Sequence, residues 1–192
     1  MILVTAFDAF GGMPVNASEM LLRALPEDPS IARAVLATAY RPAAVEIVRL
    51  IETVRPKAVI SFGTAPGFCF RLEKVACNRD TTADPDNAGE IRFNQIIDPA
   101  GPPIYEATLP HDRIAANLSA SGVPHAFSDD AGGFVCNHTF YVARHYLQQG
   151  GLAIPCGFVH VPAVADAQNF AMLLKGMRIC IESIREELQV SA

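Results

Sequence analysis

Short apolar runs alternate with longer segments of helical periodicity along this sequence, and this alternation constrains its fold most. The runs MILVTAF, AVISFG and GFVHV are each followed within a few residues by Gly or Pro, which is typical of strands buried on both faces. Between the runs, apolar residues recur every three to four positions, as from Pro42 to Val54. The sequence therefore predicts an α/β fold: a single-domain, open, twisted, largely parallel sheet with helices on both faces.

The boundaries of the expected elements follow from cap residues, Gly and Pro. We expect strands at Met1–Phe7, Ala34–Ala39, Ala58–Gly63, Leu72–Asn78, Val123–Phe127 and Gly157–Val161. We expect helices between a cap at Ser18 and Pro26, from Pro42 to Val54, and over Asp112–Ser121, Cys136–Gln149 and Ala167–Leu188. The segment Asp84–Ala100 is polar and irregular. No linker or repeat divides the chain, so we expect one domain over residues 1–192.

The predicted sheet also predicts where a functional site lies. In open α/β sheets, ligands bind in the loops at the carboxyl ends of the strands. These are the loops that follow Phe7, Gly63, Phe127 and Val161. Reactive side chains in or near these loops are the first candidates for catalysis.

Charge and hydropathy exclude several classes of function. Lys and Arg number 15 against 20 Asp and Glu, a net charge of −5, and no basic cluster occurs, so we expect no nucleic-acid partner. No apolar run approaches the ~20 residues that cross a bilayer, so we expect no membrane partner. The apolar N-terminus lacks a basic region and contains Asp8 and paired glycines, which indicates a first strand and loop rather than a signal peptide.

The five cysteines indicate a reducing compartment. Their number is odd and no CxxC pair occurs, so neither a disulfide framework nor a metal site is expected. Cytoplasmic localisation follows. Only 18% of the residues are charged and the mean hydropathy is +0.24, which favours burial of some apolar surface between subunits of a homo-oligomer.

Cys136 is the candidate nucleophile. The pair Gly132-Gly133 leads into an amphipathic helix that begins with this cysteine. Unpaired N–H groups at a helix start favour negative charge, so a thiol there is expected to ionise more readily and to attack a carbonyl. The same N–H groups could hold an oxyanion. The alternative is that Cys136 is a small core hydrophobe, as many cysteines are.

His160 is the candidate base. His138 and His145 share the helix of Cys136 but lie roughly 200° and 180° round from it, so neither faces the thiol easily. His160 lies near the carboxyl end of the strand GFVHV, where reactive side chains are expected. The alternative is a hydrogen-bonded structural histidine.

Glu73 is the candidate third member of a triad. In an extended segment it shares a face with Val75 and Cys77, where a carboxylate needs a partner such as an imidazole N–H. It would then hold His160 in the tautomer that accepts the thiol proton. The alternative is a surface ion pair with Arg71 or Lys74, both close in sequence.

Several segments resemble one family of cysteine peptidases in their order and spacing. These segments are VTAFDAFGG, EKVACN, DPDNAG, YEATLP, SDDAGGFVCNHTFY and GFVHVP, and they extend from about residue 3 to residue 165. The chain resembles the pyroglutamyl peptidase I (pyrrolidone-carboxylate peptidase) family. The resemblance implies an open α/β fold, cytosolic homo-oligomers that are dimers or tetramers, and removal of N-terminal 5-oxoproline from peptides without a cofactor.

The resemblance also implies roles for individual residues. The catalytic cysteine, histidine and glutamate of the family fall on Cys136, His160 and Glu73, the three residues selected above. Phe7 and Phe10 fall on the aromatic residues that sandwich the neutral lactam ring. A pocket for such a ring is expected to have flat apolar walls and a few hydrogen-bonding groups.

Other positions of the pocket match the family or depart from it. Asn16 matches the loop asparagine of the family, and Thr64 replaces a glutamine, so both are expected to lie at the substrate pocket. Ala83 replaces an arginine that precedes the motif PDN, and Ala9 and Ala17 replace prolines. A shifted specificity for another N-acyl or lactam amide is therefore the alternative, and a catalytically silent binder of blocked N-termini is a third possibility.

Overall fold

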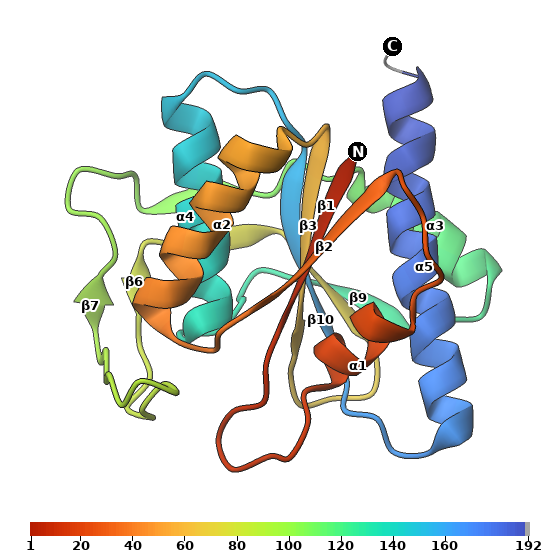
Figure 1. Ribbon diagram of the computed structural model, residues 1–192, viewed down its shortest axis with the longest axis horizontal. Coiled ribbons are helices and arrows are strands. Elements are labelled where there is room, and N and C mark those ends of the chain that lie inside the picture. The colour runs from red at the N-terminus through yellow and green to blue at the C-terminus, as the bar shows by residue number, and fades with distance from the viewer. Residues whose placement is uncertain (191–192) are drawn as a thin grey trace.

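The computed structural model describes residues 1–190 and contains a six-stranded mixed sheet with the strand order β2-β1-β3-β10-β4-β9 (Figure 1). Its strands are β1 (Ile2–Phe7), β2 (Ile31–Leu36), β3 (Ala58–Thr64), β4 (Phe70–Glu73), β9 (His125–Ser128) and β10 (Cys156–Val161). The first four in spatial order are parallel, whereas β4 pairs with β10 antiparallel and with β9 parallel. The predicted fold class, largely parallel with helices on both faces, is confirmed.

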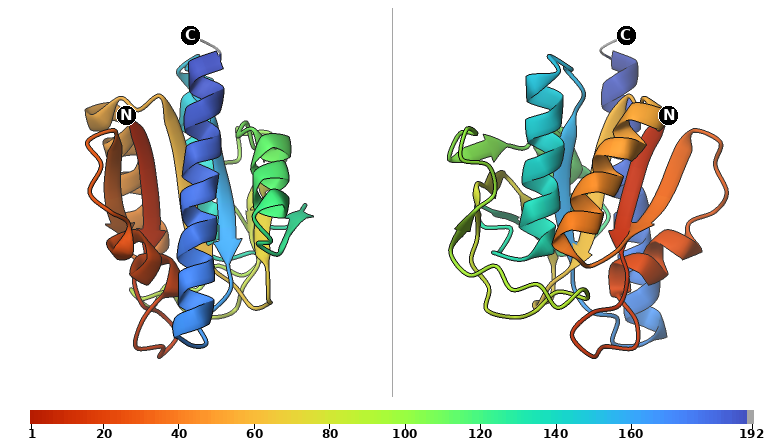
Figure 2. Two further views of the ribbon diagram at one scale, coloured as in Figure 1. Left: turned by 90° about the vertical axis from the view of Figure 1, so that its right-hand side faces the viewer. Right: turned by 60° about the vertical axis from the view of Figure 1, so that its left-hand side comes forward.

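Five helices cover the two faces of the sheet. They are α1 (Ala17–Ala24), α2 (Tyr40–Val54), α3 (His111–Ala120), α4 (Val135–Gln149) and α5 (Ala167–Val190). Helices α2 and α4 cover one face, and α1, α3 and α5 cover the other (Figures 1 and 2). Alternation along β10 divides the core, because Phe158 packs with α2 and α4 whereas Val159 and Val161 pack on the opposite face.

Two short ribbons lie beside the start of α4 (Figure 1). In one, β5 (Val75–Cys77) pairs with β8 (Ile104–Glu106), and in the other β6 (Arg79–Asp80) pairs with β7 (Gln95–Ile96). The amide of Asn137 on α4 accepts from the Cys77 backbone N–H at 2.8 Å and donates to the carbonyls of Cys77 and Arg79 at 2.9 and 3.0 Å. This side chain therefore joins both ribbons to the first turn of α4.

Three predictions about elements are wrong in detail. The second strand lies at Ile31–Leu36 rather than at Ala34–Ala39, because its register is set by pairing with β1. The predicted strand Leu72–Asn78 breaks at Lys74, so Glu73 belongs to the main sheet and shares no face with Val75 and Cys77 in the small ribbon.

The cap of the first helix also differs from the prediction. Asn16 is the N-cap of α1, and its side chain accepts from the Ser18 backbone N–H at 3.0 Å. Ser18 instead lies inside the helix, where its hydroxyl donates to Asn16 at 2.8 Å. Asn and Ser are both good caps, and the pattern of apolar residues alone did not distinguish them.

One of the loops selected as a site leaves the sheet in the other direction. Because β4 and β9 are antiparallel to β10, the loop after Phe127 starts beside the middle of β10, where Glu73 pairs with Phe158 and Ser128. The loops after Phe7, Gly63 and Val161 do share the carboxyl edge, as predicted. Within residues 1–190, no helix carries an apolar stretch long enough to cross a bilayer.

Candidate active site

The candidate nucleophile enters the site from the start of α4. Helix α4 begins at Val135, so Cys136 lies in its first turn. Glycine is required at both positions of the pair that precedes it, for a different reason at each. Gly132 has a φ of +79°, and a Cβ on Gly133 would overlap the Thr81 hydroxyl and lie 2.7 Å from the Thr81 backbone nitrogen. The loop therefore reaches α4 along a path that needs glycine at both positions.

Gly63 is a neighbour of both the thiol and the candidate base. A Cβ built on Gly63 would lie 2.7 Å from the Cys136 Sγ and 2.9 Å from the Phe158 ring. Gly63 pairs with His160 across the β3–β10 ladder. A side chain at this position of β3 would overlap the sulfur, so glycine is needed here, and the same glycine is the register partner of His160.

His160 and Glu73 form a hydrogen-bonded pair in the candidate site. The His160 Nδ1 lies 2.7 Å from the Glu73 Oε1, and the Glu73 side chain is fully buried. A carboxylate only accepts hydrogen bonds, so Nδ1 carries a proton and donates a hydrogen bond to Glu73. This tautomer leaves a lone pair on Nε2, which is the form that a general base requires.

The prediction that the Cys136 thiol ionises more readily than usual is wrong for the resting site. The pKa of Cys136 is raised to about 12, mainly because burial disfavours the thiolate and secondly because the Glu73 carboxylate is near. Arg71 and the backbone N–H at the helix start lower this pKa, but by less. The helix start therefore does not ionise the thiol by itself, and the proton must leave through a base.

Both alternatives considered for Glu73 are partly realised. Arg71 Nε lies 3.2 Å from the same Oε1 that His160 contacts, so the predicted ion pair with Arg71 exists. It is not a surface pair, because Glu73 has no exposed side-chain area. Lys74 instead pairs with Asp129 at 2.7 Å.

The two predicted aromatic residues of the pocket have different surroundings. Phe7 is fully buried, with its ring centroid 6.0 Å from that of Phe158. Phe10 lies in the loop after β1 and is partly exposed, with its ring 5.8 Å from that of Phe134 at the N-cap of α4. Phe10 can therefore contact a ligand directly, whereas Phe7 packs beneath Phe158.

Asn16 and Thr64 are joined to each other. The Thr64 hydroxyl donates to the Asn16 Oδ1 at 2.5 Å, and the Asn16 Nδ2 donates to the Asp8 carbonyl at 3.0 Å. The Asn16 side chain is buried, and its polar atoms are engaged within the protein. These two side chains connect the loop after β1 to the end of β3.

The motif PDN connects three segments near the site. Asp86 accepts from the Tyr40 backbone N–H at 2.8 Å and so caps α2, whose own N-cap residue, Ala39, provides no side-chain bond. Asn87 Nδ2 donates to the Ala9 carbonyl at 2.8 Å. Ala83, where the resemblance led us to expect an arginine, is exposed in the irregular segment before this motif.

Sequence reasoning missed two residues that shape the site, Gly63 and Phe134, and part of the role of a third, Arg71. Gly63 gives space to the sulfur, Phe134 lines the approach to α4, and Arg71 contacts both Glu73 and His160. The sequence predicted Arg71 only as a surface partner of Glu73. Because Arg71 and Glu73 are two positions apart on β4 and so share a face, alternation along the strand could also have indicated that Arg71 enters the site.

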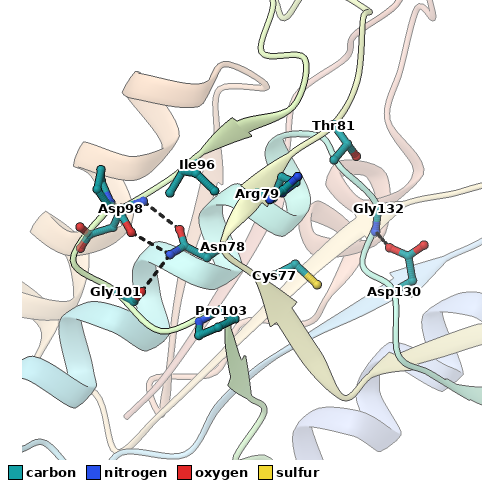
Figure 3. Close-up of a pocket in the computed structure, with 11 residues that line it drawn as sticks. Cys77, Asn78, Arg79, Thr81, Ile96, Asp98, Gly101, Pro103, Asp130 and Gly132 are labelled. Carbon is teal, nitrogen blue, oxygen red and sulfur yellow. Dashed lines mark hydrogen bonds between the residues drawn. The ribbon is translucent and has the colours of Figure 1, made fainter.

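A separate cavity of about 710 Å³ lies between the small ribbons and the loop before α4 (Figure 3). It is lined by Cys77 and Arg79, by the 96–103 segment and by Asp130 and Gly132. Glu73, Cys136 and His160 are not among its lining residues. Among residues 1–190, no cluster of three or more His, Cys, Asp or Glu side chains has an arrangement that could hold a metal ion.

Comparison with known proteins gives consistent matches over nearly the whole chain. The sequence profile described as pyroglutamyl peptidase matches residues 1–192. A pyrrolidone-carboxylate peptidase of Thermoanaerobacter sp. is 38% identical over 165 residues, which are 84% of this chain and 81% of that protein. The pyrrolidone-carboxylate peptidase of Gloeobacter violaceus is 34% identical over 203 residues, 98% of each chain.

Solved structures agree with the fold. A mutant pyrrolidone carboxyl peptidase from the hyperthermophile Pyrococcus furiosus superimposes with a TM-score of 0.89 at 28% sequence identity. The superposition covers 97% of this chain and 99% of that chain. The similarity therefore includes the sheet, the five helices and the ribbons beside α4.

Proposed function

Because this chain belongs to the pyroglutamyl peptidase family, we propose that it is a cysteine exopeptidase that removes an N-terminal pyroglutamyl group from peptides. The observation that carries the proposal is the 2.7 Å bond between His160 and the fully buried Glu73, next to Gly63 and the Cys136 sulfur. We assign the nucleophile to Cys136, the base to His160 and the orienting carboxylate to Glu73.

The reaction begins with a proton transfer that the site makes necessary. Since burial holds the thiol neutral, His160 Nε2 takes the Sγ proton while the thiolate attacks the carbonyl carbon of the pyroglutamyl residue. Glu73 stabilises the imidazolium that forms. Backbone N–H groups at the start of α4 are the donors available for the oxyanion of the tetrahedral intermediate.

The second half of the reaction returns the site to its resting state. The C–N bond breaks, His160 gives its proton to the departing amine, and a thioester remains on Cys136. Water then loses a proton to His160 and attacks the thioester. Free pyroglutamate leaves, and the sulfur takes the proton back from His160. No cofactor is required for any of these steps.

The substrate pocket is proposed to lie between the loop after β1 and the start of α4. Phe10, beside Phe134, supplies a flat apolar wall for a neutral lactam, and Phe7 supports the floor from the core. Asn16 and Thr64 hold the loop in place through their mutual hydrogen bond. Their contribution to substrate binding then depends on the shape that they give this loop.

The remaining proposals concern the state of the protein in the cell. We propose one domain over residues 1–192, of which the last two lie outside the described residues, since both core clusters share one sheet. We propose a cytoplasmic homo-oligomer, a dimer or tetramer. The five free cysteines and exposed apolar side chains such as Phe68 and Phe93, which are 94% and 66% exposed, support this proposal.

A shifted specificity is the second candidate function. It is favoured by Thr64 and Ala83, which replace polar and charged residues expected near the lactam. A panel of N-blocked amides separates the two candidates. Preference for the five-membered lactam supports pyroglutamyl hydrolysis, and preference for another acyl group supports the shifted specificity.

Replacement of the nucleophile tests the mechanism. We expect Cys136→Ala to lower the hydrolysis of a fluorogenic pyroglutamyl amide by at least about 10³-fold, because the covalent step is lost. Cys77→Ala is the matched control, since Cys77 lies on β5 outside the triad, and it should retain activity. Hydrolysis by Cys136→Ala at the wild-type rate would refute the assignment.

Thiol labelling distinguishes an enzyme from a silent binder. In the wild type, we expect iodoacetamide to alkylate Cys136 at neutral pH faster than an ordinary thiol, because His160 accepts its proton. Labelling no faster than that of a free cysteine, together with absent hydrolysis, would instead support a binder of blocked N-termini.

A further inference from the structure

A guanidinium group lies directly on the histidine–carboxylate pair of the site. Arg71 Nε is 3.2 Å from the Glu73 Oε1, and Arg71 Nη2 is 3.4 Å from the His160 Nδ1. Strand register places it there, because Arg71 pairs with His160 across the β4–β10 ladder. Arg71 and His160 are therefore fixed neighbours within the sheet.

The contact with His160 is not an ordinary hydrogen bond. Nδ1 carries a proton and donates a hydrogen bond to Glu73, so it has no lone pair to accept a hydrogen bond from Arg71. What remains between Arg71 and the ring is electrostatic. A cation at this distance opposes a positive charge on the imidazole and favours a negative charge on the nearby sulfur.

The exposed fraction of Arg71 sets the scale of this effect. Its side chain is 34% exposed, whereas Glu73 has no exposed area and His160 has 5%. Water therefore screens part of the guanidinium charge but little of the pair that it contacts. Arg71 also lowers the pKa of the Cys136 thiol, against the larger opposing effects of burial and Glu73.

We propose that Arg71 is a positioning residue that sets the pH range in which His160 can accept the proton of Cys136. This inference rests on the proposed function for the reaction, but the protonation of Cys136 and His160 that it concerns can also be followed in the free enzyme. Arg71 acts through Glu73 and His160, and no contact with substrate is required of it.

The other charged groups around His160 leave Arg71 as its principal cation. Glu73 comes from β4 and Cys136 from α4, and β3 contributes only Gly63 at this level. Within residues 1–190, Arg71 is the only lysine or arginine in ion-pair contact with Glu73.

Two further titratable groups lie beyond this inner set. Lys74 is held in its ion pair with Asp129. His111 is near enough to feel the charge of Glu73, but burial lowers the pKa of His111, so it is neutral at neutral pH.

The test removes the charge and then restores it. We expect Arg71→Gln to move the acid limb of the kcat/KM profile to higher pH by roughly 0.5–1 unit, because loss of a cation favours both the imidazolium and the neutral thiol. Arg71→Lys, which keeps a charge, should stay close to the wild-type limb. Arg49→Gln, on the exposed face of α2, is the control for loss of a remote cation.

Alkylation of Cys136 by iodoacetamide across pH provides a second readout without substrate. In Arg71→Gln, the acid limb of the pH profile of the alkylation rate should also move to higher pH. If no pyroglutamyl amide is hydrolysed even by the wild type, the proposed function fails, but the alkylation limb still tests Arg71.

A purely structural role for Arg71 would give a different result. In that case Arg71→Gln would lower the rate by the same factor at every pH, with both limbs unmoved, and this outcome would overturn the inference. Arg71→Met, of similar length and without charge, replaces Arg71→Gln if circular dichroism shows that the glutamine variant does not fold. The inference is also overturned if a folded variant without the charge shows no change in the acid limb of its alkylation profile.

Discussion

Glu73 and Asp80 are two fully buried carboxylates with closely similar partners. One oxygen of Glu73 contacts His160 at 2.7 Å and Arg71 at 3.2 Å. One oxygen of Asp80 contacts His138 at 2.9 Å and Arg92 at 3.4 Å. Among the residues that the structure describes, the second oxygen of each carboxylate is buried without a hydrogen-bond partner.

The two centres differ in what faces the histidine. His160 lies beside Gly63, which leaves space for the Cys136 sulfur. His138 packs edge-on against the ring of Tyr40, with centroids 5.3 Å apart, and Arg92 stacks 4.7 Å from the centre of the same ring. A histidine–carboxylate–arginine group is thus structural in one place, and an adjacent thiol makes the other a candidate catalytic site.

Three of the cysteines share a raised pKa although their surroundings differ. The pKa values of Cys136, Cys156 and Cys180 are all raised to about 12, in each case mainly by burial. Cys156 and Cys180 belong to the two hydrophobic clusters of the core. A high pKa therefore does not distinguish the candidate nucleophile from the cysteines of the core, whereas its position at Gly63, the register partner of His160, does.

The largest expected effect comes from removing the charge of Glu73. Glu73→Gln keeps the shape of the side chain but no longer stabilises the imidazolium or fixes the tautomer of His160. We expect kcat to fall by about 10³–10⁴-fold, as far as comparable changes do in other triads. Steady-state kinetics measure the effect, and a fall of less than tenfold would contradict the role of Glu73.

A steric change at Gly63 is expected to have the next largest effect. The added methyl group of Gly63→Ala would lie 2.7 Å from the sulfur and 2.9 Å from the Phe158 ring, so the thiol must move away from His160. We expect kcat to fall by about 10–10²-fold, since displacements near 1 Å cost about this much. Unchanged kinetics in a folded variant would show that the sulfur does not occupy this position during catalysis.

The same change of charge at Asp80 sharpens the comparison. Asp80→Asn should lower the free energy of unfolding by about 2 kcal/mol, because it weakens buried hydrogen bonds to His138 and Arg92. Its effect on kcat/KM should stay within about tenfold, because His138 packs against Tyr40 and lies outside the proposed triad. Urea denaturation and kinetics on one preparation measure both. If Asp80→Asn instead lost as much activity as Glu73→Gln and kept its stability, the distinction between a structural and a catalytic centre would be wrong.

The main elements could largely be predicted because local patterns encode them, whereas the assignment of the proposed triad depended on the resemblance to a known family. Apolar periodicity located the helices and most main strands, although the bounds of β2 and β4 were predicted wrongly, and a glycine pair before Cys136 marked the start of α4. The pair has a physical cause in the structure, a positive φ at Gly132 and the close approach of Gly133 to Thr81. Such constraints act over a few residues and therefore leave a readable signal.

Strand direction and electrostatics could not be predicted because they depend on distant partners. Nothing local to Phe70–Glu73 states that β4 runs antiparallel to β10, yet this direction places Arg71 on His160. The raised pKa of Cys136 likewise arises from tertiary burial, which exceeds the effect of the helix start. Register and desolvation appear only when segments far apart in the sequence are packed together.

Trapping of the covalent intermediate tests the central claim most directly. A reaction with a pyroglutamyl amide is quenched in acid within its first turnover, digested and analysed by mass spectrometry. We expect a pyroglutamyl adduct on the peptide that contains Cys136, and its accumulation in step with release of the first equivalent of amine. An adduct on another residue, or turnover that persists in Cys136→Ala without any adduct, would contradict the assignment of Cys136 as the nucleophile.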